Sequence, residues 1–156
     1  MKFVCLKLKS GDTLFAELLS HNYDDTVILH PFQIRTIANQ MQSGSIESVI
    51  LTPWMPFTDD NEFCIPNDTV MYIGRLSSSY LRFYGSSRFK EELSDLQRRG
   101  FDRVESGELK SDVVRDLFVE VRRMSQEYSE KYGLDPESMR DNVSFSGDEA
   151  EERVLH

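Results

Sequence analysis

The sequence predicts a mainly β fold with C-terminal helices, in which five antiparallel strands precede the helical part of a 156-residue chain. Two observations carry this prediction. Up to Ile73, apolar side chains alternate with polar ones, which is the period of strands with one buried face. After Arg75, apolar residues recur every three or four positions, as in an amphipathic helix. We therefore expect a β domain (residues 1–76), a helical extension (77–133) and an acidic tail (134–156).

The five predicted strands are separated by polar turns. They are residues 2–9, 12–21, 26–37, 46–57 and 69–76. Gly11 can adopt the positive φ that the tight turn after the first strand requires. Pro31 lies inside the third strand, and because proline has no N–H donor, it predicts a bend, a bulge or an edge position. The acidic segment 58–68 is either an ordered excursion or an extended loop.

Three helical segments are expected after the strands. Residues 77–84 begin with serines suited to capping, and residues 88–99 precede Gly100, which we expect to stop that helix. The longest helix, residues 109–132, ends at Gly133 with a proline just beyond. Its apolar residues form a coiled-coil-like helix seam: Val114, Leu117, Val121, Met124 and Tyr128. This seam could dock on the β domain or pair with another subunit.

The net charge of −9 is unevenly distributed along the chain. Residues 134–156 hold seven acids, two arginines and few apolar residues, so this tail is predicted to be disordered. Between Lys9 and Arg75 the only basic residue is Arg35, against nine acids, whereas phosphate recognition needs clustered lysine and arginine. A basic group interleaved with aromatic residues follows: Arg75, Arg82, Arg88, Lys90, Arg98 and Arg99. It is either a solvated helix face or a nucleic-acid surface, or it contacts the acidic β domain or the acidic tail of a neighbouring copy.

Composition and motifs argue against several other classes of protein. No apolar run reaches the roughly 18 residues of a membrane span, and the N-terminal pattern is not that of a signal peptide, so a cytoplasmic location is expected. We find no nucleophile with a base at meaningful spacing and no phosphate-binding loop. The sequence therefore predicts no catalytic residues, no metal site and no cofactor. Cys5 and Cys64 are expected to be half-buried free thiols.

Residues 4–29 combine a strand, a glycine turn, a second strand, a polar loop and a third strand. This spacing resembles the first sequence motif of the Sm-like (Lsm) family of small β-barrels. A second run, Thr52-Pro-Trp-Met-Pro-Phe-Thr-Asp-Asp with the later Cys64-Ile-Pro and Val70-Met-Tyr-Ile73, is similar to short Sm-like proteins from phages of marine cyanobacteria. The resemblance covers residues 2–76.

The resemblance implies a strongly bent five-stranded antiparallel Sm-like barrel, here with a helical extension, that assembles as a homo-oligomeric ring. A barrel of roughly 75 residues builds only a marginal core alone, and open sheet edges favour pairing. In the family, the fourth strand of one subunit pairs with the fifth strand of the next. The matching oligomer seam in this chain comprises Val49, Ile50, Leu51, Val70, Met71, Tyr72 and Ile73.

Members of the family also bind single-stranded RNA around the ring pore, with loop residues after the second strand and an Arg-Gly pair between the last two strands. At matching positions, the loop histidine falls on Asp24 and the loop asparagine on Thr26. The Arg-Gly pair is missing, because Gly74 and Arg75 stand in the reverse order at the end of the last strand. With the neighbouring alternatives included, the candidate RNA contacts are His21, Asn22, Asp24, Thr26, Arg75 and Arg82.

We therefore interpret the sequence as a non-enzymatic Sm-like ring of phage origin that serves as an assembly or interaction scaffold in the host cytoplasm. Its partners would be copies of itself and an unidentified protein, and not a membrane. The alternative is a single-stranded RNA-binding ring. Carboxylates in the loop where RNA phosphate should pass are repulsive, which favours the scaffold.

Overall fold

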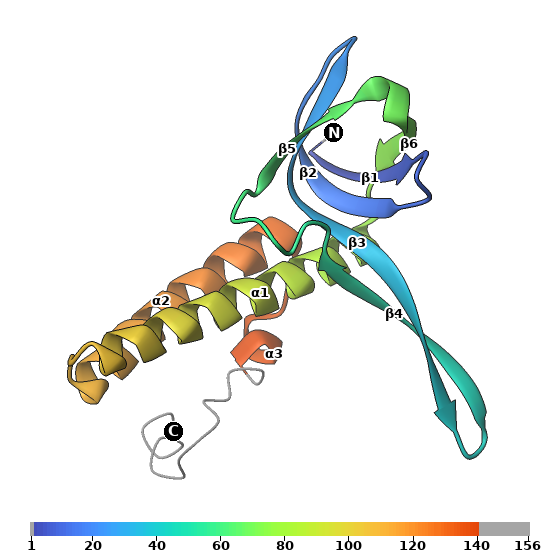
Figure 1. Ribbon diagram of the computed structural model, residues 1–156. Helices are drawn as coiled ribbons and strands as arrows, with labels where there is room; N and C mark the ends of the chain where they lie inside the picture. The colour runs from blue at the N-terminus through green and yellow to red at the C-terminus, as the bar shows by residue number, and fades with distance from the viewer. Residues whose placement is uncertain (1, 141–156) are drawn as a thin grey trace. The chain divides into compact units, whose positions relative to one another are not determined.

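The computed structural model describes residues 2–140. The chain divides after Tyr84 into two compact units (Figure 1). The first unit holds all six strands and the first turns of helix α1. The helices are α1 (Ser78–Glu105), α2 (Lys110–Tyr132) and α3 (Pro136–Arg140), and a short 3-10 helix, η1 (Asn67–Thr69), lies among the strands. Within the described part of the chain, no helix is long and apolar enough to cross a membrane.

Six strands build one antiparallel sheet. They are β1 (Phe3–Leu8), β2 (Thr13–His21), β3 (Asp25–Met41), β4 (Gly44–Pro53), β5 (Glu62–Pro66) and β6 (Val70–Arg75). The order is β4-β3-β2-β1-β6, with β5 paired to β3 as well. The sheet is not closed within the described residues, so the structure differs from the closed barrel of five strands that the resemblance implied.

The additional strand, β5, lies in the segment that the sequence left open between an excursion and a loop. β4 pairs with residues 32–41 of β3, and β5 pairs with residues 25–29. Because β2 occupies the opposite edge of both halves of β3, β4 and β5 lie along the same edge. The two strands therefore continue one another, and an ordered excursion, residues 54–61, separates them.

Strand β3 changes direction at His30 and Pro31, where the register of the β2–β3 pairing shifts. His30 has a φ of 50°, and Pro31 needs no hydrogen-bond acceptor because it has no N–H. The excursion closes over this irregularity. The His30 N–H donates to the Asn61 carbonyl at 2.7 Å, and the Trp54 N–H donates to the Pro31 carbonyl at 3.0 Å. The prediction of a bend or bulge at Pro31 is confirmed.

The core of the first unit is made by the inward side chains of the sheet, which alternate along the strands as predicted. The buried members are Val4, Leu6, Leu8, Leu14, Ala16, Ile28 and Ile65. Partly buried residues pack against this core at the two ends of the sheet. At these ends they are Phe63 on β5 and Val70 and Ile73 on β6, and Leu18 and Trp54 pack against the core elsewhere. The core is therefore incompletely covered at both outer edges.

Helix α1 is continuous, whereas the sequence predicted two helical segments with a stop at Gly100. The helix instead uses its glycines for close packing against α2. A Cβ atom at Gly100 would lie 2.8 Å from Leu117 Cδ1, and one at Gly85 would overlap the side chain of Tyr132. Because these side chains occupy the space that a Cβ would take, packing outweighs the poor helix propensity of glycine.

The predicted helix seam packs on α1 of the same chain, a partner that was not among the two predicted for it. Four of its five residues are buried: Leu117, Val121, Met124 and Tyr128. Val114 is only half-buried, and its neighbour Val113 is buried instead. The Tyr128 ring lies 5.5 Å from the Phe89 ring of α1, centroid to centroid. The short connection between α1 and α2 brings both apolar faces together in a helical hairpin.

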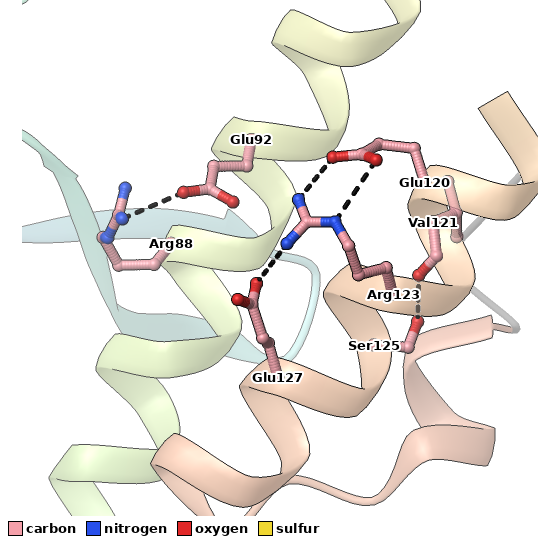
Figure 2. Close-up of polar contacts among 7 residues, drawn as sticks. All are labelled: Arg88, Glu92, Glu120, Val121, Arg123, Ser125 and Glu127. Atoms are coloured by element: carbon pink, nitrogen blue, oxygen red, sulfur yellow. Dashed lines mark hydrogen bonds and ion pairs between the residues drawn. The ribbon is translucent and has the colours of Figure 1, made fainter. Parts of the chain in front are cut away.

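Charged residues of this hairpin are paired along each helix. Figure 2 shows Arg88 bonded to Glu92 within α1, at 3.0 Å between Nη2 and Oε1. Arg123 joins Glu120 and Glu127 within α2 (Figure 2). Arg88 is buried, so it does not contribute to the exposed basic surface that the sequence grouped around it.

The start of the predicted disordered tail is ordered. Helix α3 contacts α2, and Met139 within it is buried. Asp135 accepts the Glu137 N–H through its side chain at 3.1 Å, which fixes the first turn of α3. The prediction of disorder is therefore wrong for residues 136–140, because an apolar side chain anchors this turn. Residues 141–156 lie outside the described residues.

Candidate functional site

Two segments meet at one end of the sheet, residues 21–26 and 67–69, and together form what we term the loop cluster. Asn67, the first residue of η1, joins them. Its side-chain amide donates to the carbonyl of Asn22 at 2.6 Å and to that of Tyr23 at 3.1 Å. These bonds hold two turns that are distant in sequence as one surface.

Thr26 supports the loop cluster from inside the unit. Its hydroxyl donates to Asn67 Oδ1 at 2.6 Å. The direction of this bond is fixed because Asn67 Nδ2 donates to two carbonyls, so the amide oxygen, which can only accept, faces Thr26. The same hydroxyl oxygen then accepts from His21 Nδ1 at 2.7 Å. Thr26 is fully buried, so it positions the loop and does not present an exposed contact to RNA.

Tyr23 is the most exposed side chain of the loop cluster, with 96% of its surface accessible. The turn beneath it is held by Asn22 Oδ1, which accepts the N–H groups of Asp24 at 3.0 Å and Asp25 at 2.9 Å. An exposed ring on an ordered turn is a platform for base stacking. Tyr23 and Asn67 are not among the site residues predicted from the sequence. A lone aromatic residue in a polar loop and the turn composition Pro-Asn-Asp-Thr are the signals that could have revealed them.

The electrostatics of the loop cluster are acidic. Its two segments contain three aspartates and no lysine or arginine. Arg75 lies at the other end of β6, and with a rise of about 3.3 Å per residue it is roughly 17 Å along the strand from Val70. Arg82 belongs to the exposed face of α1. The structure therefore places neither arginine in the loop cluster.

The outer edges of the sheet are the second candidate site. Within residues 2–140, no strand pairs with the outer edge of β6 or with that of β5. Phe63 lies on one edge, and Val70 and Ile73 lie on the other, where each leaves part of its apolar surface uncovered. Unpaired edge strands of this kind are ready to pair with another chain.

The predicted seam residues fall on two different parts of the sheet. Four lie on the free edge strand β6: Val70, Met71, Tyr72 and Ile73. Met71 and Tyr72 are 65% and 63% exposed. The other three, Val49, Ile50 and Leu51, lie on β4 in an arm formed only by β3 and β4 beyond Gln33 (Figure 1). β5, which the sequence analysis did not recognise as a strand, is the edge that adjoins the core.

The cysteines and the other titratable groups form no third candidate site in the described part of the chain. Both cysteines are free there, with Cys5 half-buried as predicted and Cys64 exposed. Burial raises the pKa of the Cys5 thiol, which disfavours the reactive thiolate. No three His, Cys, Asp or Glu side chains among residues 2–140 gather in a geometry that could hold a metal ion.

Comparison with known protein families identifies a match. A family model described as the Sm_like domain matches residues 5–85, which run from β1 to the first turns of α1. A search of curated proteins gives no match to the chain.

Proposed function

Because the chain belongs to the Sm-like family, we propose that its sheet unit assembles head to tail with copies of itself into a ring that serves as an assembly or interaction scaffold. The observation that supports this proposal is the pair of unpartnered sheet edges, each of which leaves core residues partly exposed. The β5 edge of one copy pairs with the β6 edge of the next. Since the two edges differ, the contact is heterologous and its repetition can close a ring.

Edge pairing would satisfy both the backbone and the core. β5 has five residues and β6 has six, so the two edges match in length. Pairing would occupy their free N–H and C=O groups and cover Phe63, Val70 and Ile73. The ring is proposed to be non-enzymatic and cytoplasmic, and its phage origin rests on the resemblance of residues 52–73 alone.

Light scattering coupled to size exclusion tests the ring. We expect the wild-type chain to form a closed oligomer at micromolar concentration and Met71→Asp to form monomers. Met71 is exposed in the single chain, so the monomer should tolerate the change. Leu19→Asp, at an exposed apolar position of β2, is the matched control and should remain oligomeric. A monomeric wild-type chain would overturn the proposal.

A second function, single-stranded RNA binding, is favoured by the exposed Tyr23 ring, which a ring assembly would repeat around its axis. Fluorescence anisotropy with a mixed-sequence RNA oligonucleotide at low salt tests it. Tyr23→Ala should weaken binding roughly 5- to 100-fold, the size of a lost base–aromatic stack. Phe101→Ala, at an exposed ring on α1 with no role in the proposed ring, is the control. Failure of the wild-type oligomer to bind RNA at low salt would exclude this function and leave the scaffold.

A further inference from the structure

Two sets of exposed side chains of opposite charge belong to the sheet unit, one at the beginning of β5 and one from the end of β6 onward. Asp59, Asp60 and Glu62 stand at the beginning of the β5 edge, in and just after the excursion. Arg75 ends β6, and Arg82 lies in the first turns of α1. All five side chains are exposed, and none forms an ion pair within residues 2–140.

We propose that the excursion, residues 54–61, docks on the next copy of this chain at the end of its β6, so that the acidic edge of each copy neutralises the basic edge of its neighbour. This inference rests on the proposed ring and assigns its contacts. It also gives Arg75 and Arg82 a role in assembly, although the sequence analysis had placed them among the RNA contacts.

Strand direction brings the two charge sets together. Every pairing in this sheet is antiparallel, and antiparallel pairing sets the beginning of one strand beside the end of the other. β5 begins at Glu62, directly after the excursion, and β6 ends at Arg75. Antiparallel pairing of β5 with the next copy's β6 therefore places the acids beside the arginines. Parallel pairing would separate them by the length of the strand.

The backbone of the excursion is ordered by contacts at both of its ends. Its two ends bond to β3 through backbone groups, and the Trp54 ring packs on Phe63 at 5.6 Å between centroids. The Asp60 N–H donates to Thr58 Oγ1 at 3.1 Å, which shapes the turn that carries the acids. Phe57 is fully exposed on this ordered segment. Because the backbone of the excursion is held at both ends and the Phe57 ring is exposed, Phe57 is suited to anchor the contact.

The basic edge offers a surface that matches the excursion. Tyr80 lies between Arg75 and Arg82 in sequence, is half exposed, and packs edge-on against Phe15 at 5.6 Å between ring centroids. Its exposed surface, five residues after the end of β6, is the apolar contact that we assign to the next copy's Phe57. This arrangement of an aromatic centre and a charged rim is the usual anatomy of a specific interface.

Complementary charge reversal tests the inference. The first variant carries Asp59→Arg and Asp60→Arg, and the second carries Arg75→Glu and Arg82→Glu. Each variant alone would face like charges across every seam, so its assembly should weaken roughly 10- to 100-fold. In an equimolar mixture every seam between unlike variants is complementary, and mixed oligomers of alternating composition should form. Light scattering measures assembly, and native mass spectrometry identifies the mixed species.

Two control variants show whether a loss of assembly is caused by the seam charges or by a change in net charge. The oligomeric state of the wild-type chain shows separately whether the proposed ring exists. Asp102→Arg with Glu105→Arg, and Arg35→Glu with Arg122→Glu, make the same two charge reversals at exposed residues outside both edges, and should assemble as the wild type does. Variants that assemble normally, or variants that stay monomeric when mixed, would overturn the inference while a wild-type oligomer still supports the ring. A monomeric wild-type chain would instead overturn the proposed function.

Discussion

Replacement of Asn67 by alanine should destabilise the sheet unit strongly, although the residue lies in a surface turn. Its side chain makes three hydrogen bonds, one from the Thr26 hydroxyl and two to carbonyls of the other turn. These bonds are the side-chain link between the two segments of the loop cluster. Removing them leaves only backbone contacts between the turns, such as the Asn67 N–H to the Asp24 carbonyl, whereas an ordinary surface substitution changes stability by less than about 0.5 kcal/mol.

The magnitude follows from the number of bonds. Each neutral hydrogen bond contributes a net of about 1 kcal/mol, so Asn67→Ala should cost about 2–3 kcal/mol, given that Thr26 keeps its bond with His21. With an m-value on the order of 1.5 kcal/mol/M, this loss lowers the urea midpoint by about 1.3–2 M. Asn67→Asp keeps an acceptor for Thr26 but loses the donor to two carbonyls, so it should also destabilise the unit.

Urea unfolding followed by tryptophan fluorescence measures the unfolding of the sheet unit. Trp54 is the only tryptophan of the chain, and it packs against the core of the sheet. The control is Asn39→Ala, at an exposed asparagine in the β3–β4 arm, which should leave the midpoint unchanged. Subunit concentration is kept constant because assembly would itself stabilise the fold. An Asn67→Ala midpoint equal to that of the control would refute the reasoning.

Three further predictions concern the helical unit. Gly85→Ala gains about 1 kcal/mol of helix propensity but forces a methyl group into the Tyr132 side chain, so we expect a net loss of about 1–2 kcal/mol by calorimetry. Hydrogen bonds from Arg123 hold the pKa of Glu120 below its usual range. The stabilisation from Glu120 is therefore present above about pH 4.5 and lost as the pH falls through its lowered pKa, and Glu120→Gln should flatten this acid-side decline of helix stability in circular dichroism. Met139→Ala should lower the unfolding free energy of the unit by about 2 kcal/mol, since this buried side chain anchors α3; an unchanged midpoint would show that the turn is not docked.

Local rules were sufficient for much of the fold. Alternation of apolar residues predicted the strands from Phe3 to Arg75, and Pro31 marked the bulge because a missing N–H has the same consequence in any sheet. They failed at β5 and at Gly100, where the deciding partner is distant in sequence. β5 is a strand because it pairs with β3, and Gly100 continues a helix because Leu117 of another helix occupies the space beside it.

The loop cluster and the sheet edges also combine features that the sequence predicts with features that only the tertiary structure sets. The sequence by itself determined the Sm-like character, the polar loop at residues 21–26 and an acidic β domain, because these depend on the order and type of neighbouring residues. Only the tertiary structure decided that Asn67 joins this loop and that Thr26 is buried beneath it. It likewise decided that β5 adjoins the core at the free edge. Contacts between residues some forty positions apart depend on how the sheet bends, and no local pattern encodes that geometry.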